Sequence, residues 1–551
     1  MAFIRYRKLV LDQNGNVKSG SAAIIDAVYD PGNKKNHSRQ VVREKLGKVV
    51  IYTSNKKGLF QSPTRGLVWY DSSKDEFSPQ VTRSELESDE DNKDKDAVRD
   101  RFPSPGIHTV FGDGYLLIEI LKKSGILKML HSAFPEQTSY QRLLAHICYG
   151  ILRDGSRISC EDFISKSFLS YLVPDVPLRS LKSDTAYFEE MGKESTKLAF
   201  FQEFIRCRRK EYPEFGKACY IDSTPLPNDI NSPFNALCSH GVANTSVQMR
   251  LALVIDEITL DPLWYMIIPG NVLDFDTIRP LIRDIEISLD IKVNSYTLDA
   301  GYVTKSLIKA FPIQPENETI PDKHYLARMP AKRGYPYKTL YHQVKNQFGN
   351  AKHEFIRGHH AYFAQEKEIE IFGEPVMAYI YIDQYNALKL YTEYRIKSPD
   401  DFEKLSMRDQ NWFKVKFGYF VLLSNQRKTA AAILDDYFAR TRIEGFFKSS
   451  KEYLKLLPLC KWTDERVRGK ILSDIIDQII RSEIMRMRKT STQSISEIIG
   501  KTQSLMCCWD AGNDEFVIDS PNRQVKDIFK LFRIPIPQQL NYTNYKQMIY
   551  V

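Results

Sequence analysis

The stretch with the clearest chemical potential is YFARTRIEGFFKSSK, which lies in a run, residues 428–456, that the apolar periodicity predicts to be one helix. A rotation of about 100° per residue places four of its residues within an arc of roughly 60°: Tyr437, Arg440, Glu444 and Lys451. A partly buried carboxylate between cations can hold a metal ion or meet a phosphate. The alternative is a solvated stripe with internal pairs such as Arg440 with Glu444.

Two further acids end predicted strands of an α/β layout. From Ala218 the sequence predicts three strands, ACYIDST, VQMRLALVIDE and LDPLWYMIIPG, then a helix at residues 273–289 and a fourth strand, VNSYTLD. Three strands, a helical crossover and a fourth strand indicate a mixed sheet of the RNase H-like kind. Its first and fourth strands are neighbours, so Asp222 and Asp299 are expected side by side, with the helix of Glu444 laid across them.

These three carboxylates define a candidate catalytic and metal site. Hard oxygen donors without His or Cys nearby in sequence suit two Mg²⁺ ions rather than zinc. Two metals about 4 Å apart activate an attacking water or 3′-hydroxyl and stabilise the leaving oxygen in an in-line displacement at phosphorus. Each aspartate has another interpretation: Asp222 precedes Ser-Thr-Pro and Asp299 precedes Ala-Gly, so either could simply begin a turn.

Residues 328–357 interleave cations with aromatic rings and contain a single acid, Glu354. The cations are Arg328, Lys332, Arg333, Lys338, Lys345, Lys352 and Arg357, and the rings are Tyr335, Tyr337, Tyr341, Phe348 and Phe355. Cations suit a phosphate backbone and rings suit unstacked bases, so the segment is a candidate DNA surface. A solvated basic sheet face is the alternative.

The composition is that of a globular protein, and its positive net charge is compatible with a polyanionic partner. The 551 residues are 42% apolar and carry a formal net charge of +9. The eight cysteines form no C-x-x-C pair, which argues against zinc and disulfides and favours a reducing compartment. No signal core or apolar run long enough to span a bilayer is present, so we expect a soluble intracellular protein without a membrane partner.

The changes of pattern along the chain predict five regions. In order, they are a small β module (1–75), a charged linker (76–105), a helical DNA-binding domain (106–214), the RNase H-like catalytic core (215–455) and a mainly helical C-terminal region (456–551). A β-rich insertion at residues 330–416 precedes the last helix of the core. It includes the strand-like sequences EIEIFGEPVMAYIYIDQY and ALKLYTEYRIK. The predicted fold class is α/β, a mixed sheet flanked by helices.

The sequence resembles the DDE transposases of bacterial insertion sequences that carry a Y-(2)-R-(3)-E-(6)-K signature. Tyr437, Arg440, Glu444 and Lys451 reproduce this spacing without a gap. YIDST resembles the family's first-Asp strand, PLWYMIIPGNVLDFDT its "PGN" segment, LDAGY its second-Asp motif and FVLLSN the strand before the signature helix. The resemblance covers residues 110–540 in order. One departure is Ala300-Gly301-Tyr302, where many relatives carry a basic residue after the Asp.

The resemblance implies roles for the site residues. Asp222, Asp299 and Glu444 would be catalytic and hold two Mg²⁺ ions, with Mn²⁺ as a substitute. Tyr437, Arg440 and Lys451 would contact phosphates or bases near the cleaved transposon end. The β-rich insertion before the signature helix is also a feature of this group.

The resemblance also implies the reaction. The protein would bind the terminal inverted repeats of its element as double-stranded DNA, release a 3′-hydroxyl at each end and join it to target DNA. This reaction is cut-and-paste transposition. It would take place in a prokaryotic cytoplasm, at the nucleoid. Synapsis of two ends implies at least a homodimer. A silent DNA-binding repressor of transposition and an RNase H-like nuclease without strand transfer are the alternatives. The resemblance leaves four points open: the terminal-repeat sequence, the target preference, the role of residues 1–100, and whether excision passes through a hairpin.

Overall fold

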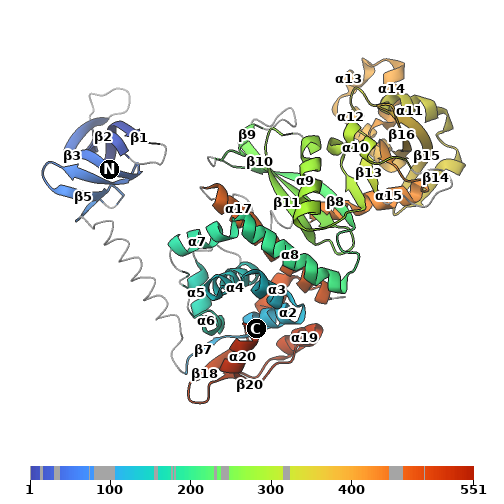
Figure 1. Cartoon of the computed structure of the whole chain (residues 1–551). Coiled ribbons are helices and arrows are strands. Elements are labelled where there is room, and N and C mark those ends of the chain that lie inside the picture. The colour runs from blue at the N-terminus through green and yellow to red at the C-terminus, as the bar shows by residue number, and fades with distance from the viewer. Residues whose placement is uncertain are drawn as a thin grey trace. The chain divides into compact units, whose positions relative to one another are not determined.

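The structure is a computed structural model with two compact units, Met1–Asp96 and Ala97–Val551, which are described separately (Figure 1). It describes residues 2–12, 17–29, 38–73, 75–79, 106–153, 159–174, 176, 178, 181–228, 232–237, 247–272, 274–313, 323–445, 463–488 and 491–550. Within these ranges no helix has both the length and the apolar character that a membrane span requires.

The first unit is a six-stranded antiparallel sheet with its strands in chain order. They are β1 (Ala2–Leu11), β2 (Val17–Tyr29), β3 (Ser38–Ser54), β4 (Lys57–Ser62), β5 (Gly66–Asp71) and β6 (Glu76–Pro79). Apolar side chains gather on one face and form a separate core that includes Ile24, Leu46 and Phe60. The predicted β module is thus present, but β6 continues past residue 75 into the predicted linker. The rest of that linker, residues 80–105, lies outside the described residues.

The second unit begins with a helical part. Its helices are α2 (Gly112–Lys123), α3 (Ile126–Ala133), α4 (Gln137–Leu152), α5 (Cys160–Ser165), α6 (Leu169–Leu172), α7 (Leu181–Met191) and α8 (Glu194–Glu211). Their apolar stripes are buried against one another, as in α2, where Leu117, Ile118 and Leu121 are almost fully buried.

The C-terminal elements complete this helical part. They are α17 (Asp464–Met487), α18 (Ile495–Thr502), β18 (Met506–Asp510), β19 (Glu515–Ile518), α19 (Arg523–Phe532), β20 (Gln539–Asn541) and α20 (Tyr542–Ile549). β18 pairs with β7 (His108–Val110), which precedes α2, and α17 packs against α4 and α7. In Figure 1 the red C-terminal elements accordingly lie among the cyan helices.

A ten-stranded sheet forms the centre of the second unit, in the order β11-β10-β8-β12-β13-β17-β16-β15-β14 with β9 beside β10. Its first strands are β8 (Ala218–Pro227), β9 (Ala236–Leu237), β10 (Val247–Asp256), β11 (Pro262–Pro269), β12 (Ser295–Leu298) and β13 (His324–Arg328). β8, β10 and β11 are antiparallel, whereas β12 is parallel to both β8 and β13. This order and these directions confirm the predicted RNase H-like sheet. Between these strands lie α9 (Asp274–Ser288), η2 (Ala300–Tyr302) and α10 (Lys305–Ala310).

The insertion extends this sheet. β14 (Glu354–Arg357), β15 (His360–Ile371) and β16 (Glu374–Asp383) of the insertion, and β17 (Tyr419–Ser424), which follows it, add antiparallel strands beyond β13. Its other elements are helical: α11 (Tyr337–Val344), η3 (Lys345–Gln347), η4 (Ala351–His353), α12 (Gln384–Lys397), α13 (Pro399–Glu403) and α14 (Met407–Lys416). The prediction of a strand at ALKLYTEYRIK is wrong, because Asp383 caps the start of α12 by accepting a hydrogen bond from the Asn386 N–H.

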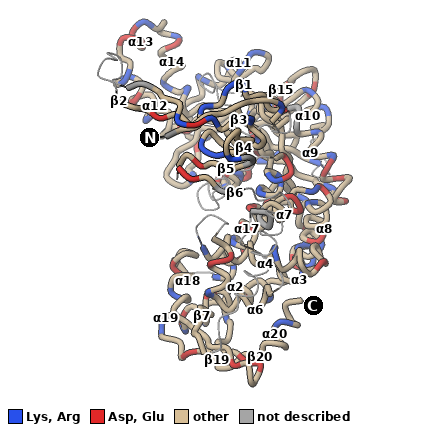
Figure 2. The backbone as a smooth tube through the Cα atoms, turned by 90° about the vertical axis from the view of Figure 1, so that its left-hand side faces the viewer, with Lys and Arg blue, Asp and Glu red and all other residues tan. Residues whose placement is uncertain are grey.

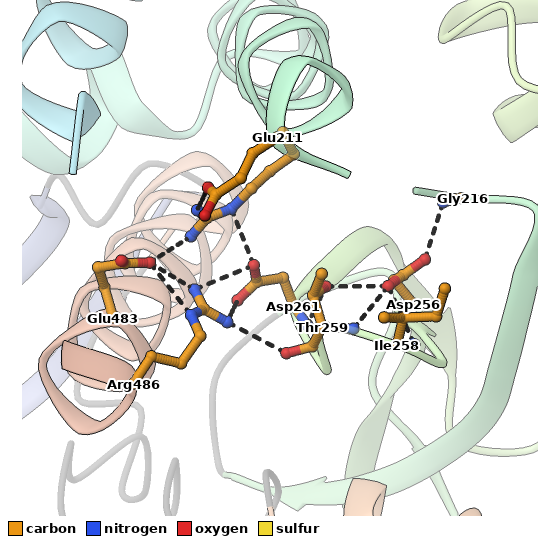
Figure 3. A network of polar contacts seen from close by, with 9 residues as sticks. Glu211, Gly216, Asp256, Ile258, Thr259, Asp261, Glu483 and Arg486 are labelled. Atoms are coloured by element: carbon orange, nitrogen blue, oxygen red, sulfur yellow. Dashed lines mark hydrogen bonds and ion pairs between the residues drawn. The ribbon is translucent and has the colours of Figure 1, made fainter. Parts of the chain in front are cut away.

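A buried network of two cations and two carboxylates joins the helical part to the sheet. Arg208 of α8 pairs with Asp261, beside β11, at 2.9 Å and with Glu483 of α17 at 2.8 Å. Arg486 pairs with the same two acids at 3.1 and 2.7 Å, and Figure 3 shows it between them. Burial raises the pKa of Asp261, while the two arginines oppose this effect. For Glu483 burial also acts to raise the pKa, but the arginines outweigh it and the net shift is downward.

We expect Asp261→Ala to lower the stability of the second unit by about 3 to 5 kcal/mol, because it removes the fully buried acid that pairs with the buried Arg208 and the partly buried Arg486. Urea unfolding of the full chain, followed by circular dichroism, measures the loss. The matched control is Glu211→Ala. Glu211 also pairs with Arg208, at 3.7 Å, but its side chain is 62% exposed, so the control should cost less than about 1 kcal/mol. Equal losses for the two variants would contradict a larger contribution from the buried acid than from the exposed one.

Candidate catalytic site

Asp222 and Asp299 lie side by side on neighbouring parallel strands. Ile221 of β8 is paired with Leu298 of β12, and the two aspartates follow directly. Asp299 comes after the last residue of β12, as predicted, whereas Asp222 lies inside β8, which continues to Pro227 because it stays paired with β10. Asp299 also occupies the N-cap position of η2, yet its side chain makes no capping hydrogen bond. Its carboxylate is therefore not used to hold the turn.

The helix that carries the signature is tightened at Arg440. α15 spans Ala430–Ala439, Arg440 forms a turn, and residues 441–445 are helical again. The Arg440 N–H donates to the Tyr437 carbonyl at 3.1 Å and the Ile443 N–H donates to the Arg440 carbonyl at 2.9 Å, which are the i to i+3 bonds of a 3₁₀ turn. The prediction of one regular helix over 428–456 is therefore wrong at this point. Its last part, which includes Lys451, lies outside the described residues.

Buried apolar neighbours fix the orientation of this segment. Ile443 is fully buried and Tyr437 is 6% exposed, so both sides of the tightened turn pack into the interior. Arg440 lies between them in sequence and is itself only 8% exposed. A guanidinium so far from solvent requires acidic partners.

The Arg440 guanidinium supplies that pairing by contacting all three candidate acids. Its Nη1 lies 3.1 Å from Asp222 Oδ2, and its Nη2 lies 3.7 Å from Asp299 Oδ1 and 4.0 Å from Glu444 Oε1. The exposed fractions of the three carboxylate side chains rise in the same order, from 20% to 47% and 62%. The structure thus brings together the three acids that the sequence singled out, with a buried cation between them.

The pKa shifts agree with this geometry. Burial acts to lower the pKa of Arg440, but Tyr437, Asp222, Asp299 and Glu444 raise it, and the net shift is upward. Burial raises the pKa of the Tyr437 phenol, and Asp299 adds to the rise while Arg440 and Arg328 oppose it. The Tyr437 hydroxyl donates a long hydrogen bond of 3.5 Å to Asp299 Oδ1. Tyr437 is therefore protonated at neutral pH and faces the same acid as Arg440.

The structure also gathers the four predicted DNA-binding residues of the insertion, Arg328, Lys332, Arg333 and Lys338, around one pocket of 720 Å³. The other lining residues are Ala331, Tyr335, Tyr337, Thr339, Leu405, Asp409, Trp412, Phe413, Lys416, Phe417 and Tyr419. Arg328, which lines the pocket, is the last residue of β13, and its charge acts to lower the pKa of Tyr437. Sequence reasoning missed the side of the pocket formed by α14, with Trp412 and Lys416, because that helix lies far along the chain from the basic segment.

Other basic residues of the same segment lie elsewhere. Arg357 is in β14, pairs with Asp435 of α15 and lies over the ring of Phe438. Lys345 and Lys352 belong to the short turns η3 and η4 and do not line the pocket. The pocket thus gathers only part of the basic segment, and residues of α11 and α14 contribute to its lining.

The donor set of the three acids fits a divalent cation. Carboxylate oxygens are the preferred ligands of Mg²⁺, and here they converge on a single positive charge. Within the described ranges no three His, Cys, Asp or Glu side chains come close enough together to hold a metal ion as they stand. Arg440 lies among these acids, so a metal ion would compete with its guanidinium for the carboxylates.

Residues 215–475 match a protein family described as the transposase DDE domain, and the chain therefore carries such a domain. Transposases of this kind cleave and rejoin DNA and generally use divalent metal ions. A solved cryo-EM structure of piggyBac transposase, in a synaptic complex with hairpin DNA, resembles the chain with a TM-score of 0.37 and 11% sequence identity, over 71% of this chain and 79% of that chain. No curated protein shows significant sequence similarity.

We expect Arg440→Gln to bind Mn²⁺ about tenfold or more tightly than the unaltered protein when DNA is absent. The variant removes a positive charge within 4.0 Å of each carboxylate, and a unit charge at that range is worth about 1 to 4 kcal/mol. Isothermal titration calorimetry or the Mn²⁺ electron paramagnetic resonance signal measures the affinity.

The control for this prediction is Arg442→Gln. It removes the same charge two residues away, from an exposed side chain with no ion pair among the described residues. Adding Asp222→Asn to Arg440→Gln should remove the gain. Equal Mn²⁺ affinities of Arg440→Gln and the unaltered protein would contradict the competition between Arg440 and the metal.

Proposed function

We propose that the protein is an insertion-sequence transposase that binds the terminal inverted repeats of its element, cleaves the DNA at each end and joins the freed 3′-hydroxyl to target DNA. The observation that supports this proposal most is the convergence of Asp222, Asp299 and Glu444 on Arg440 within a transposase DDE domain. The three acids come from two neighbouring strands and one helix, so their meeting is a product of the fold.

In this proposal Asp222, Asp299 and Glu444 are the catalytic residues and hold two Mg²⁺ ions, for which Mn²⁺ can substitute. The bound ions would activate the attacking oxygen and stabilise the leaving oxygen at phosphorus. Glu444 is the most exposed of the three acids and lies on the segment that follows the tightened turn. It is therefore the ligand best placed to shift position when DNA enters.

Arg440 and Tyr437 are proposed to contact the cleaved end of the DNA. The fork of a guanidinium can pair with two phosphate oxygens, and such a phosphate would replace the carboxylates as the partner of Arg440. The phenol of Tyr437 stays protonated and can donate a hydrogen bond. Lys451 keeps the same proposed role from the sequence alone.

The pocket of the insertion is proposed to bind the DNA next to the cleavage site. Arg328, at the end of β13, lines it together with Lys332, Arg333 and Lys338. The rings of Tyr335, Tyr337 and Trp412 offer apolar surface among these cations. A complex that holds two such ends requires at least a homodimer. We propose that this homodimer acts on double-stranded DNA in the prokaryotic cytoplasm, at the nucleoid.

Replacing a proposed metal ligand should abolish cleavage and leave DNA binding in place. We expect Asp222→Asn and Glu444→Gln to lower the rate of Mg²⁺-dependent cleavage by at least about 10³-fold, because each removes a charged ligand. The substrate is a supercoiled plasmid that carries the DNA flanking the coding region, and an electrophoretic mobility shift measures binding. Asp256→Asn is the control. Asp256 is a buried acid of the same sheet that accepts hydrogen bonds from Gly216, Ile258 and Thr259. Cleavage by the Asp222 variant would overturn the site.

Neutralising the insertion pocket should weaken binding to DNA of any sequence. For Lys332→Gln/Arg333→Gln/Lys338→Gln we expect the slope of log affinity against log salt to fall by about 2 to 3, as for the loss of three phosphate contacts. Fluorescence anisotropy with a labelled duplex in EDTA measures the slope.

The control for the pocket is Lys389→Gln/Lys397→Gln/Lys404→Gln, which removes the same charge from α12 and the end of α13. Helices α12–α14 carry both signs of charge (Figure 2). The comparison therefore separates the effect of the cations in the pocket from the effect of the net charge of the insertion. An equal fall in slope for the two variants would count against a specific role of the pocket.

A further inference from the structure

The first unit carries a cationic face that the site in the second unit does not use. The β1–β2 and β2–β3 pairings define two rows across three strands. Arg7, Ser21 and Lys48 form one row, and Arg5, Ala23 and Lys45 form the other. Residues two apart on a strand share a face, so Arg5 and Arg7 lie together on β1, with Ser21 and Ala23 beside them on β2. The extra residue of the irregularity near Gly47 lets Lys45 and Lys48 share that face on β3.

The opposite face of the same strands is the core of the unit. Ile4, Ala22 and Leu46 are buried there, and each is adjacent in sequence to a residue of the two rows. Arg7, Ser21, Lys45 and Lys48 are exposed, whereas Arg5 and Ala23 are partly exposed. The rows therefore face solvent within this unit.

The four cations of the rows have no acidic partner among the residues that the structure describes. The nearby acids are engaged elsewhere: Asp26 and Asp75 pair with Arg43, each at 2.7 Å, and Glu44 pairs with Arg65 at 2.8 Å. Among the described residues of this unit, the charge of the face is therefore not paired.

The shape of this face suits a phosphate backbone. Adjacent strands are about 4.8 Å apart, so the cations on β1 and β3 flank a strip about 10 Å wide whose floor is made of the small residues Ser21 and Ala23. The two rows contain no aromatic ring on which an unpaired base could stack. Cations at this spacing contact phosphates without reading bases.

We propose that this face, formed by Arg5, Arg7, Lys45 and Lys48 around Ser21 and Ala23, is a second, sequence-independent binding surface for the backbone of duplex DNA. The choice of DNA as the polyanion rests on the proposed function of the second unit. Such a surface would add affinity without specificity, so it would help to hold DNA that the other unit cuts or joins, including target DNA.

The test measures binding of the full chain to a duplex of unrelated sequence in EDTA, where no cleavage occurs. For Arg5→Gln/Arg7→Gln/Lys45→Gln/Lys48→Gln we expect a loss of about tenfold or more at low salt and a fall of about 3 to 4 in the salt slope. The matched control is Lys8→Gln/Lys18→Gln/Lys56→Gln/Lys57→Gln, which removes the same charge from exposed positions elsewhere on the unit. It should leave most of the affinity and slope. Circular dichroism of both variants checks that the sheet still folds.

Equal losses for the two variants would overturn the surface, since only net charge would then matter. Tighter binding of an RNA duplex than of the DNA duplex would overturn the assignment to DNA. Failure of the proposed function is distinguishable, because it would appear as absent cleavage of flanking DNA by the unaltered protein while the difference between the two variants persisted.

Discussion

The site depends on one electrostatic arrangement, a buried guanidinium among three carboxylates. Asp222, Asp299 and Glu444 would repel one another at this spacing, and Arg440 would pay a large desolvation cost without them. The acids therefore offset the desolvation of Arg440, and Arg440 reduces the repulsion among the acids. Arginine suits the position because its fork reaches Asp222 with one nitrogen and the other two acids with the second, which the single ammonium of lysine could not do.

This arrangement couples the two ligands of the proposed reaction. A divalent cation would take the carboxylates from Arg440, and a DNA phosphate would take Arg440 from the carboxylates. Each ligand thus removes the partner that opposes the other, so the binding of each favours the binding of the other by the same free energy. Under the proposed function, a bound DNA end would strengthen metal binding, so the metal site would fill less readily in its absence.

The rest of the second unit holds the parts of the site in place. The parallel pairing of β8 and β12 sets the two aspartates side by side, and the 3₁₀ turn at Arg440 directs the guanidinium at them. The network of Arg208, Asp261, Glu483 and Arg486 fixes the hairpin of the sheet to α8 and α17. The pairing of β17 with β13 joins the strands of the insertion to the same sheet, and Arg328 at the end of β13 lines the cationic pocket.

From the sequence alone, the class of sheet followed, because strand and helix order limits an RNase H-like core to few arrangements. The sequence also singled out the three acids that the structure places around Arg440, whose role as ligands stays a proposal. It also indicated Arg328, Lys332, Arg333 and Lys338, but only as a basic segment.

The tertiary structure decided three things that local pattern does not encode. α12 is a helix because its cap and packing outweigh a strand-like composition. Trp412 and Lys416 join the pocket from a distant helix. Arg440, one of four polar residues on a stripe, became the common partner of the acids because the turn is tightened and Ile443 and Tyr437 are buried beside it. Such contacts arise from long-range packing, which sequence spacing alone does not specify.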